Sequence, residues 1–242
     1  MSDARKAAAA DAALQDVESG MVLGLGSGTT AHAFLLGVGR RIASGDLADV
    51  RGVPTSRATE RTARKTGIPL IDLPAGGVDL AVDGMDELDG ALNAIKGLGG
   101  ALLREKIVAA SARGFVLIGD DGKRSTRLGT LAPLPVEVLA FGVARTEDRL
   151  RALGLEPRLR GGETEPFLSD NGNPILDCAL PTEADLDRLA AELDGLPGVL
   201  GHGLFLGMAD VAYLASETGA SETSASETAA SETTVERLVR PS

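Results

Sequence analysis

Two short runs of the sequence combine carboxylates, an amine and glycines in a pattern suited to handling a small polar molecule. The first run is Asp83-Gly-Met-Asp86-Glu87, and the second is Lys96-Gly-Leu-Gly-Gly-Ala-Leu-Leu-Arg-Glu105-Lys106. Each run follows a hydrophobic segment that predicts a strand, and open α/β sheets bind their ligands where strands end. A glutamate that moves a proton, a lysine that holds a developing oxyanion and an aspartate that contacts substrate oxygens suffice for enolisation chemistry.

The same residues also allow simpler interpretations. Asp83, Asp86 and Glu87 could form a solvated acidic turn or the N-cap of a helix, where negative charge is favourable. Three carboxylates within five positions could also hold magnesium or calcium, but the spacing is not that of an EF-hand and Lys96 would compete for the carboxylates. From these residues alone the helix cap is favoured. Lys96 and Glu105 could form an exposed helix charge pair, and each of them, taken singly, is better explained by a structural role than by a catalytic one.

A third candidate is the loop Gly24-Leu-Gly26-Ser27-Gly28-Thr29-Thr30, which lies between a predicted strand and a predicted helix. Its amides and hydroxyls could bind an oxyanion such as phosphate at the helix N-terminus. Thr29 occupies the place of the third glycine of a dinucleotide motif, and no Lys-Ser/Thr pair of a P-loop follows. Nucleotide binding is therefore weakly supported. A tight turn capped by Ser27 or Thr29 explains the loop as well as an anion site does.

Alternating strands and helices must position these residues. After an alanine-rich helix that ends near residue 19, the hydrophobic pattern predicts strands over 21–25, 50–54, 68–72, 80–82 and 115–119, and helices over 29–41, 58–66 and 101–112. This alternation predicts an α/β fold with a doubly wound, mostly parallel, Rossmann-like sheet.

The order of the predicted strands and helices changes after residue 133. Strands are predicted over 136–140, near 157–160, and over 175–179 and 199–205, with helices over 146–153 and 183–193. This β-α-β-β-α-β order is that of a ferredoxin-like α+β unit. We therefore expect a smaller domain over 133–205 and a Rossmann-like catalytic domain formed by 1–132 and 206–242.

The C-terminal part contains a repeat of small and acidic residues. Ser-Glu-Thr recurs at 216, 221, 226 and 231, and this five-residue period fits neither a helix nor a strand. Such a composition offers almost no apolar surface to bury. We expect residues 216–234 to form a solvated, mobile insertion, followed by a closing strand or short helix over 235–239.

Composition excludes several function classes. The chain of 242 residues has 35 acidic and 24 basic residues, a formal charge of -11 that disfavours nucleic acid as a partner. Cys178 is the only cysteine, which excludes an intrachain disulfide and fits a reducing compartment. Residues 1–14 carry charges that interrupt the apolar core a signal peptide needs, and no later segment is long and apolar enough to span a membrane. A cytoplasmic protein without a membrane partner is expected.

Taken together, the motifs resemble type A ribose-5-phosphate isomerase. The resemblance rests on the loop 24–30, on the two runs that contain Asp83 and Glu105, and on Pro133-Leu-Pro-Val-Glu-Val, and it extends from about Lys6 to Tyr213. It implies the reversible conversion of ribose 5-phosphate to ribulose 5-phosphate through a cis-enediolate, in the non-oxidative pentose phosphate pathway. It also implies a sugar phosphate as the small-molecule partner, no metal or other cofactor, and a homodimer or a dimer of dimers.

The resemblance assigns roles to individual residues. It implies that Glu105 carries the proton between carbons 1 and 2, that Lys96 stabilises the enediolate oxygen, and that Asp83 assists ring opening and oxygen protonation. Substrate contacts are expected from Lys6, Ser27, Gly28, Thr29, Thr30, Gly84, Met85, Asp86, Gly97, Leu98, Gly99 and Lys123, with the two lysines near the phosphate. Leu98 and Met85 depart from the family pattern, which commonly has glycine and alanine at these positions.

Two other functions compete with the isomerase. A coenzyme A transferase of related fold would use Glu105 as a covalent nucleophile, and a thioester trapped on this residue would favour that function. A sugar-phosphate sensor would bind its ligand without turnover. No helix-turn-helix segment precedes Met21, and all three candidate catalytic residues are present, so the sensor is the weaker alternative.

Overall fold

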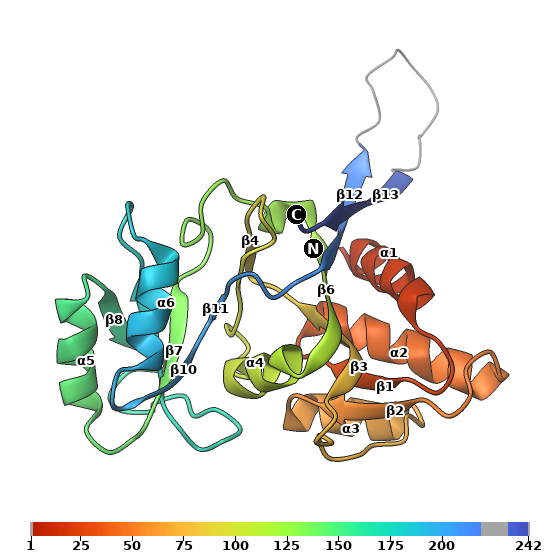
Figure 1. Cartoon of the computed structure of the whole chain (residues 1–242), viewed down its shortest axis with the longest axis horizontal. Helices are drawn as coiled ribbons and strands as arrows, with labels where there is room; N and C mark the ends of the chain where they lie inside the picture. The colour runs from red at the N-terminus through yellow and green to blue at the C-terminus, as the bar shows by residue number, and fades with distance from the viewer. Residues whose placement is uncertain (1, 219–231, 242) are drawn as a thin grey trace, which may run out of the picture.

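The computed structural model describes residues 2–218 and 232–241 and contains two larger sheets joined by a small one (Figure 1). The larger sheet has the strand order β13-β12-β6-β3-β1-β2. Neighbouring strands are parallel except for β13, which runs antiparallel to β12. The predicted doubly wound, mostly parallel sheet is thereby confirmed. Its strands are β1 (Val22–Leu25), β2 (Arg51–Pro54), β3 (Val78–Gly84), β6 (Ala112–Asp120), β12 (Val211–Thr218) and β13 (Glu232–Val239).

Helices cover both faces of this sheet because its strands are apolar on both sides. The cluster of buried residues on one face joins the sheet to α1 (Asp3–Ala13), α2 (Thr29–Ser44) and α3 (Arg57–Lys65). The cluster on the other face joins it to α4 (Leu102–Ala110). Helix α1 is shorter than predicted, because the 3-10 turn η1 (Leu14–Asp16) follows it. Over residues 2–218 and 232–241, no helix combines the length and the apolar character needed to cross a membrane.

A second sheet has the strand order β10-β7-β9-β8 and is entirely antiparallel. It consists of β7 (Leu134–Val138), β8 (Glu156–Leu159), β9 (Ile175–Ala179) and β10 (Val199–His202), and it packs against α5 (Val143–Ala152) and α6 (Leu186–Asp194). The predicted ferredoxin-like element order is observed. Cys178 lies in its core as a small apolar residue, and burial raises the pKa of its thiol to about 12.

A small three-stranded sheet that the sequence did not predict connects the two larger ones. It contains β4 (Glu87–Leu88), β5 (Ala94–Ile95) and β11 (Leu204–Phe205). The single strand predicted over 199–205 is divided at Gly203, whose carbonyl accepts the Lys96 N–H at 3.0 Å and whose own N–H donates to the Pro135 carbonyl at 2.8 Å. The small sheet therefore places Lys96 between the two larger sheets.

Two further sequence predictions are wrong. Residues 68–72 do not form a strand, because Pro69 cannot donate to a ladder and the segment makes only the isolated bridge between Gly52 and Leu70. No helix begins at Asp83, which lies near the end of β3, while Glu87 begins β4. The helix-cap interpretation of these carboxylates is thus replaced by a strand-to-strand connection in which both are buried.

The C-terminal hairpin corrects the predicted limits of the acidic repeat. Strands β12 and β13 pair from Val211 opposite Val239 to Thr218 opposite Glu232, so the two ends of the predicted insertion 216–234 are paired strand rather than loop. Its central residues, 219–231, lie outside the described residues. The closing segment 235–239 is a strand, and it forms the edge of the sheet (Figure 1).

Candidate active site

A cavity of about 500 Å³ lies at the carboxyl ends of β1, β3 and β6, where a parallel sheet places ligand-binding loops. The structure gathers nearly all the predicted site residues around it. Asp83 lies just below its surface and Leu98 is outside its lining. The lining residues are Lys6, Ser27, Gly28, Thr29, Thr30, Gly84, Met85, Asp86, Lys96, Gly97, Gly99, Glu105, Asp120, Gly122 and Lys123.

Three buried charged residues meet at one end of this cavity. The Lys96 Nζ atom lies 3.0 Å from Asp83 Oδ2 and 3.3 Å from Glu105 Oε2, and it also donates to the Gly84 carbonyl. Each of the three residues is at most 6% exposed. β3 supplies Asp83, the end of β5 supplies Lys96, and the first turn of α4 supplies Glu105. Lys96 and Glu105 come close because only the short glycine turn separates the end of β5 from the start of α4.

The two carboxylates differ in their hydrogen bonding. Asp83 Oδ1 accepts the backbone N–H groups of Ser27 at 2.9 Å and Gly84 at 2.7 Å, in addition to the contact of Oδ2 with Lys96. Glu105 Oε2 is within ion-pair distance of Lys96 but lacks the geometry of a hydrogen bond to any residue that the structure describes. Asp83 is therefore the better stabilised anion, and Glu105 is the carboxylate left to accept a proton.

Burial and neighbouring charges bring the pKa of Glu105 close to neutral pH. Burial, reinforced by the negative charge of Asp83, raises the pKa of Glu105 to about 8, although Lys96 pulls it down. Burial also raises the pKa of Asp83 against the opposing effect of Lys96. For Lys96, burial lowers the pKa, but the adjacent carboxylates outweigh it and the net pKa is raised. Lys96 therefore stays cationic while Glu105 exchanges a proton.

The close approach of Gly26 to Asp83 provides a test of this arrangement. A Cβ atom at Gly26 would lie 2.2 Å from Asp83 Oδ1 and 2.5 Å from the Asp83 Cα. Gly26→Ala is therefore expected to displace Asp83 and to lower kcat/KM about 100-fold, the scale on which small misplacements act, with a stability loss of about 1–3 kcal/mol. Steady-state kinetics and urea unfolding measure both effects.

The matched control is Gly76→Ala, because a Cβ atom at Gly76 meets open space and its backbone is not left-handed. If the Gly26 variant were as active and as stable as the Gly76 variant, Asp83 would not depend on this close approach.

Another part of the cavity lining is suited to an anionic group. Helix α2 begins there behind Gly28, whose φ of 91° belongs to the region that favours glycine, and no side chain caps this N-terminus. Its first N–H groups therefore point out of the helix with the positive end of the dipole. Lys6 from α1 and Lys123 from the 3-10 turn η2 (Asp121–Lys123) line the same cavity. Two cations and a helix N-terminus form a binding site of the kind that phosphate prefers.

The Ser27 hydroxyl bonds to three other hydroxyl groups of the protein. Its Oγ atom contacts Thr55 Oγ1 at 2.9 Å, Ser56 Oγ at 2.8 Å and Thr59 Oγ1 at 3.1 Å. These hydroxyls lie around the N-terminus of α3, where Ser56 is the N-cap. Ser27 thus ties the loop 24–30 to α3, and the contact that it makes with the catalytic cluster comes from its backbone N–H.

The two residues that depart from the family pattern point in different directions. Leu98 is 42% exposed and lies outside the cavity lining, while its N–H donates to Asp86 Oδ2 at 2.9 Å. A role for Leu98 in substrate binding stays a prediction about its backbone. Met85 is buried and packs in the cluster of apolar residues between the large sheet and α4, so it fills core volume beside the cavity.

The carboxylates of the first run do not form one metal site. Asp83 faces Lys96 and Asp86 faces Leu98, whereas the buried Glu87 accepts the N–H groups of Gly129 and Ala132 and both donors of Thr130. Burial opposes ionisation of Glu87, but hydrogen bonding from the Ser125 side chain and from these donors outweighs it and lowers its pKa. Glu87 therefore anchors the segment that leads into the second sheet. Among the described residues no three His, Cys, Asp or Glu side chains are grouped as metal ligands.

Sequence reasoning missed Asp120 and Gly122, which also line the cavity. The signal was available, because Asp120 directly follows the predicted strand 115–119 and ends β6 beside the carboxyl end of β3. The carboxyl ends of adjacent parallel strands meet at one edge of the sheet, so the same rule that selected Asp83 applies to Asp120.

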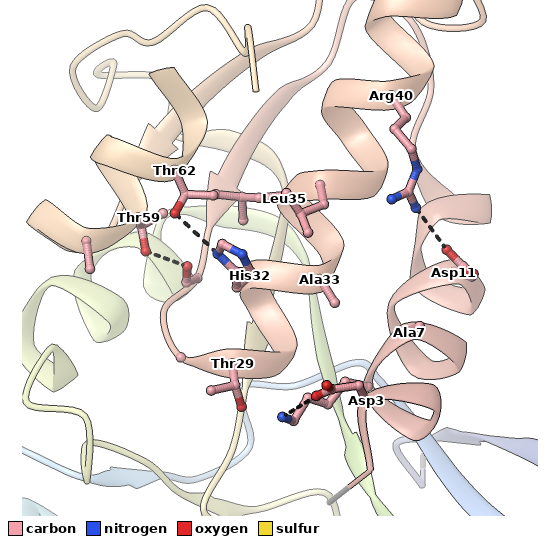
Figure 2. Close-up of a pocket in the computed structure, with 15 residues that line it drawn as sticks. Asp3, Ala7, Asp11, Thr29, His32, Ala33, Leu35, Arg40, Thr59 and Thr62 are labelled. Atoms are coloured by element: carbon pink, nitrogen blue, oxygen red, sulfur yellow. Dashed lines mark hydrogen bonds and ion pairs between the residues drawn. The ribbon is translucent and has the colours of Figure 1, made fainter. Parts of the chain in front are cut away.

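A second cavity, of about 630 Å³, lies among α1, α2 and α3 (Figure 2). It borders the first cavity, since Lys6, Gly28 and Thr29 line both. Its charged residues form the pairs Lys6 with Asp3 and Arg40 with Asp11, and His32 contacts the Thr62 hydroxyl. It contains no buried acid beside a buried cation, so the first cavity is the candidate active site.

Comparisons with known proteins show to which family the chain belongs. The model of the family Ribose 5-phosphate isomerase A (phosphoriboisomerase A) matches residues 51–219. The chain is 53% identical over 213 residues to the ribose-5-phosphate isomerase A of Roseiflexus sp. (strain RS-1), covering 87% of this chain and 91% of the relative. It is 44% identical to that of Deinococcus radiodurans over 203 residues, covering 84% of this chain and 90% of the relative.

Solved structures give the same result. The ribose 5-phosphate isomerase of Plasmodium falciparum superposes with a TM-score of 0.87 at 36% identity and covers 99% of each chain. A D-ribose-5-phosphate isomerase solved in complex with phospho-erythronic acid also has a TM-score of 0.87, at 33% identity, and covers 99% of this chain and 100% of its own. On both the sequence and the structural comparison, this chain belongs to the ribose-5-phosphate isomerase A family.

Proposed function

We propose that this protein interconverts D-ribose 5-phosphate and D-ribulose 5-phosphate. The observation that carries the proposal is the contact of Lys96 with Asp83 at 3.0 Å and with Glu105 at 3.3 Å, in a cavity whose lining also includes a helix N-terminus and two lysines. The charged cluster suits proton transfer beside a carbonyl, and the helix N-terminus with the lysines suits a phosphate. The family to which the chain belongs is named for this activity.

The side chains can carry out the reaction as a proton transfer between neighbouring carbons. With the open-chain aldose bound, Glu105 takes the proton from carbon 2, and the electron pair forms the carbon 1–carbon 2 double bond while the carbonyl oxygen becomes an oxyanion. Lys96 stabilises this charge, because a fixed cation in a dry site acts strongly on it. A proton moves from oxygen 2 to oxygen 1, and Glu105 returns its proton to carbon 1. Asp83 keeps Lys96 charged and in place and is suited to assist ring opening.

The direct test is the formation of ribulose 5-phosphate from ribose 5-phosphate in the presence of a strong chelator. Activity under these conditions would establish both the reaction and its independence of a dissociable metal. A protein that binds ribose 5-phosphate in calorimetry but forms no ketose would instead support a sensor, and the proposed function would fail.

The pH dependence tests the role of Glu105 separately. A base must be deprotonated to act, and the pKa of Glu105 is raised to about 8. We therefore expect kcat/KM to rise with pH, with its midpoint near 8, and to level off only above that midpoint, because lower pH protonates Glu105 in the free enzyme. The profile is measured from pH 5 to 9.5 at constant ionic strength. A midpoint near the usual glutamate pKa of about 4.3 would contradict the proposed environment.

We also propose that the enzyme is a cytoplasmic homodimer in which residues 133–205 form a smaller domain. The single, buried cysteine supports a reducing compartment. Exposed apolar side chains support association, since Phe141 is 88% exposed and Leu131, Leu139 and Leu168 are each more than 40% exposed. Light scattering coupled to size exclusion measures the mass, and a monomer at working concentration would exclude the dimer.

A further inference from the structure

Arg160, which directly follows β8 in the second sheet, reaches the glycine turn of the candidate active site. Its Nη1 atom donates to the carbonyl of Gly97 at 3.1 Å and to that of Leu98 at 2.9 Å. Its Nε and Nη2 atoms form a two-pronged contact with Asp177 of β9, at 2.9 Å and 2.5 Å. We propose that Arg160 is a positioning residue, which holds the turn 96–100 so that the Gly99 N–H faces the substrate.

The planarity of the peptide bond gives the direction of the amides. In a trans peptide the C=O and the following N–H point in opposite directions. The Gly97 carbonyl points to Arg160, and the Leu98 N–H of the same peptide donates to Asp86 on the other side of the turn. The Leu98 carbonyl also points to Arg160, so the Gly99 N–H is turned away from it. Gly99 lines the cavity, and its N–H has no partner among the described residues.

A second contact, from the loop between β8 and β9, supports the turn. Phe167 packs directly on Gly100, since a Cβ atom at Gly100 would lie 2.5 Å from the Phe167 ring. The Arg160 guanidinium lies 5.4 Å from the centroid of that ring, and the Phe167 N–H donates to the Arg160 carbonyl at 2.8 Å. The turn is thus enclosed by Asp86 on one side and by Arg160 with Phe167 on the other.

The positive charge of Arg160 also supports the proposed role, because it makes the Gly99 N–H a stronger donor. A cation bonded to a carbonyl polarises the peptide and strengthens its N–H as a donor, and hydrogen bonds that involve a charged group are the stronger ones. The Arg160 side chain is 14% exposed, so solvent screens this effect only in part. The consequence, which rests on the proposed function, is a preorganised donor for an oxygen of the substrate that becomes more negative during enolisation.

Lysine cannot replace Arg160 in this role, because a single ammonium cannot hold Asp177 with two donors and reach two carbonyls with a third. We expect Arg160→Met and Arg160→Lys each to lower kcat/KM for ribose 5-phosphate about 10- to 100-fold, since the turn loses its alignment. Asp177→Asn is expected to have a smaller effect in the same direction. The control is Arg158→Met, an exposed arginine on β8, which is expected to leave kcat/KM unchanged.

A second measurement separates positioning from general loss of structure. Amide hydrogen exchange is expected to become faster at residues 97–100 in Arg160→Met, while protection of β9 and α6 stays as in the unchanged protein. Calorimetric binding of phospho-erythronic acid, the compound bound to a related isomerase, is expected to weaken in proportion to kcat/KM.

These readouts distinguish the two proposals. If the unchanged protein binds phospho-erythronic acid without isomerising ribose 5-phosphate, the proposed function fails, but the binding ratio and the exchange rates still test Arg160. Unchanged exchange at 97–100 together with unchanged binding in Arg160→Met would overturn the positioning role. Equal acceleration of exchange throughout the second sheet would overturn it as well, because Arg160 would then be only structural.

Discussion

Replacing Glu105 with glutamine is expected to lower kcat by about 10²–10⁴-fold, the range that general base catalysis contributes, while substrate affinity changes little. Glutamine keeps the shape of the side chain and can still contact Lys96, but it cannot accept the proton from carbon 2. Steady-state kinetics give kcat and KM, and calorimetry gives the affinity for ribose 5-phosphate. The matched control is Glu192→Gln on α6, a residue that does not line the cavity, and this variant should retain full activity.

The same substitution is expected to stabilise the fold at neutral pH. The folded pKa of Glu105 is raised above the unfolded value, so ionisation costs stability as pH rises from about 4.3, the ordinary value, toward about 8. Below that interval the Glu105 side chain is neutral in both the folded and the unfolded state. The difference in stability between the unchanged protein and Glu105→Gln therefore disappears. The Tm of Glu105→Gln should therefore exceed that of the unchanged protein at pH 8 and match it near pH 4. A kcat within twofold of the unchanged protein would reject the catalytic role.

Replacing Lys96 with methionine is expected to reduce both activity and stability. Two buried carboxylates would lose the cation that lies 3.0 Å and 3.3 Å from them. The loss of a charge stabiliser for the oxyanion predicts a fall in kcat of about 10²–10³-fold. The loss of one partner from a buried ion pair predicts about 3–5 kcal/mol of destabilisation.

The stability loss should depend on pH with a definite sign. Without Lys96 the pKa values of Asp83 and Glu105 rise further, so both groups are readily neutralised in acid and become costly as pH increases. Urea unfolding should show a larger difference at pH 8 than at pH 5. Adding Glu105→Gln to Lys96→Met should restore part of the stability but none of the activity. Lys65→Met, an exposed change on α3, is the control. Equal losses at both pH values would show that the three charges are not coupled.

The sequence predicted the larger sheet and the convergence of the site better than it predicted the connections. Long apolar runs mark β1 and β6 because both faces of the sheet are covered, and turn residues mark their ends. The two-residue strands β4, β5 and β11 carry no such pattern, because each is defined by its partners rather than by its own periodicity. The segment 68–72 has the opposite problem: it is apolar enough for a strand, but Pro69 prevents a regular ladder.

The roles of individual side chains were also predictable from the sequence only in part. Lys96 and Glu105 could be expected to share a cleft, because both follow strand ends, although each alone resembled an ordinary surface charge. Glu87 could not be separated from Asp83 by sequence, since only the partners at Gly129 to Ala132 show that it anchors a connection. Arg160 gave no signal either. Its target is 62 residues away along the chain, and the contact depends on how the second sheet sits against the glycine turn.

The antiparallel strand β13 protects the main sheet from pairing with strands of other molecules. It covers β12, whose residues 212–215 are buried and apolar and would otherwise offer open backbone groups to a strand of another molecule. Both faces of β13 carry charge: Glu236 is paired with Arg124 on one face, and Arg237 donates to the Tyr213 hydroxyl on the other. Charged side chains on an outermost strand discourage strand addition and amyloid-like stacking. The C-terminal hairpin thus protects against aggregation, a task separate from the chemistry of the cavity, whose lining includes no residue of β12 or β13.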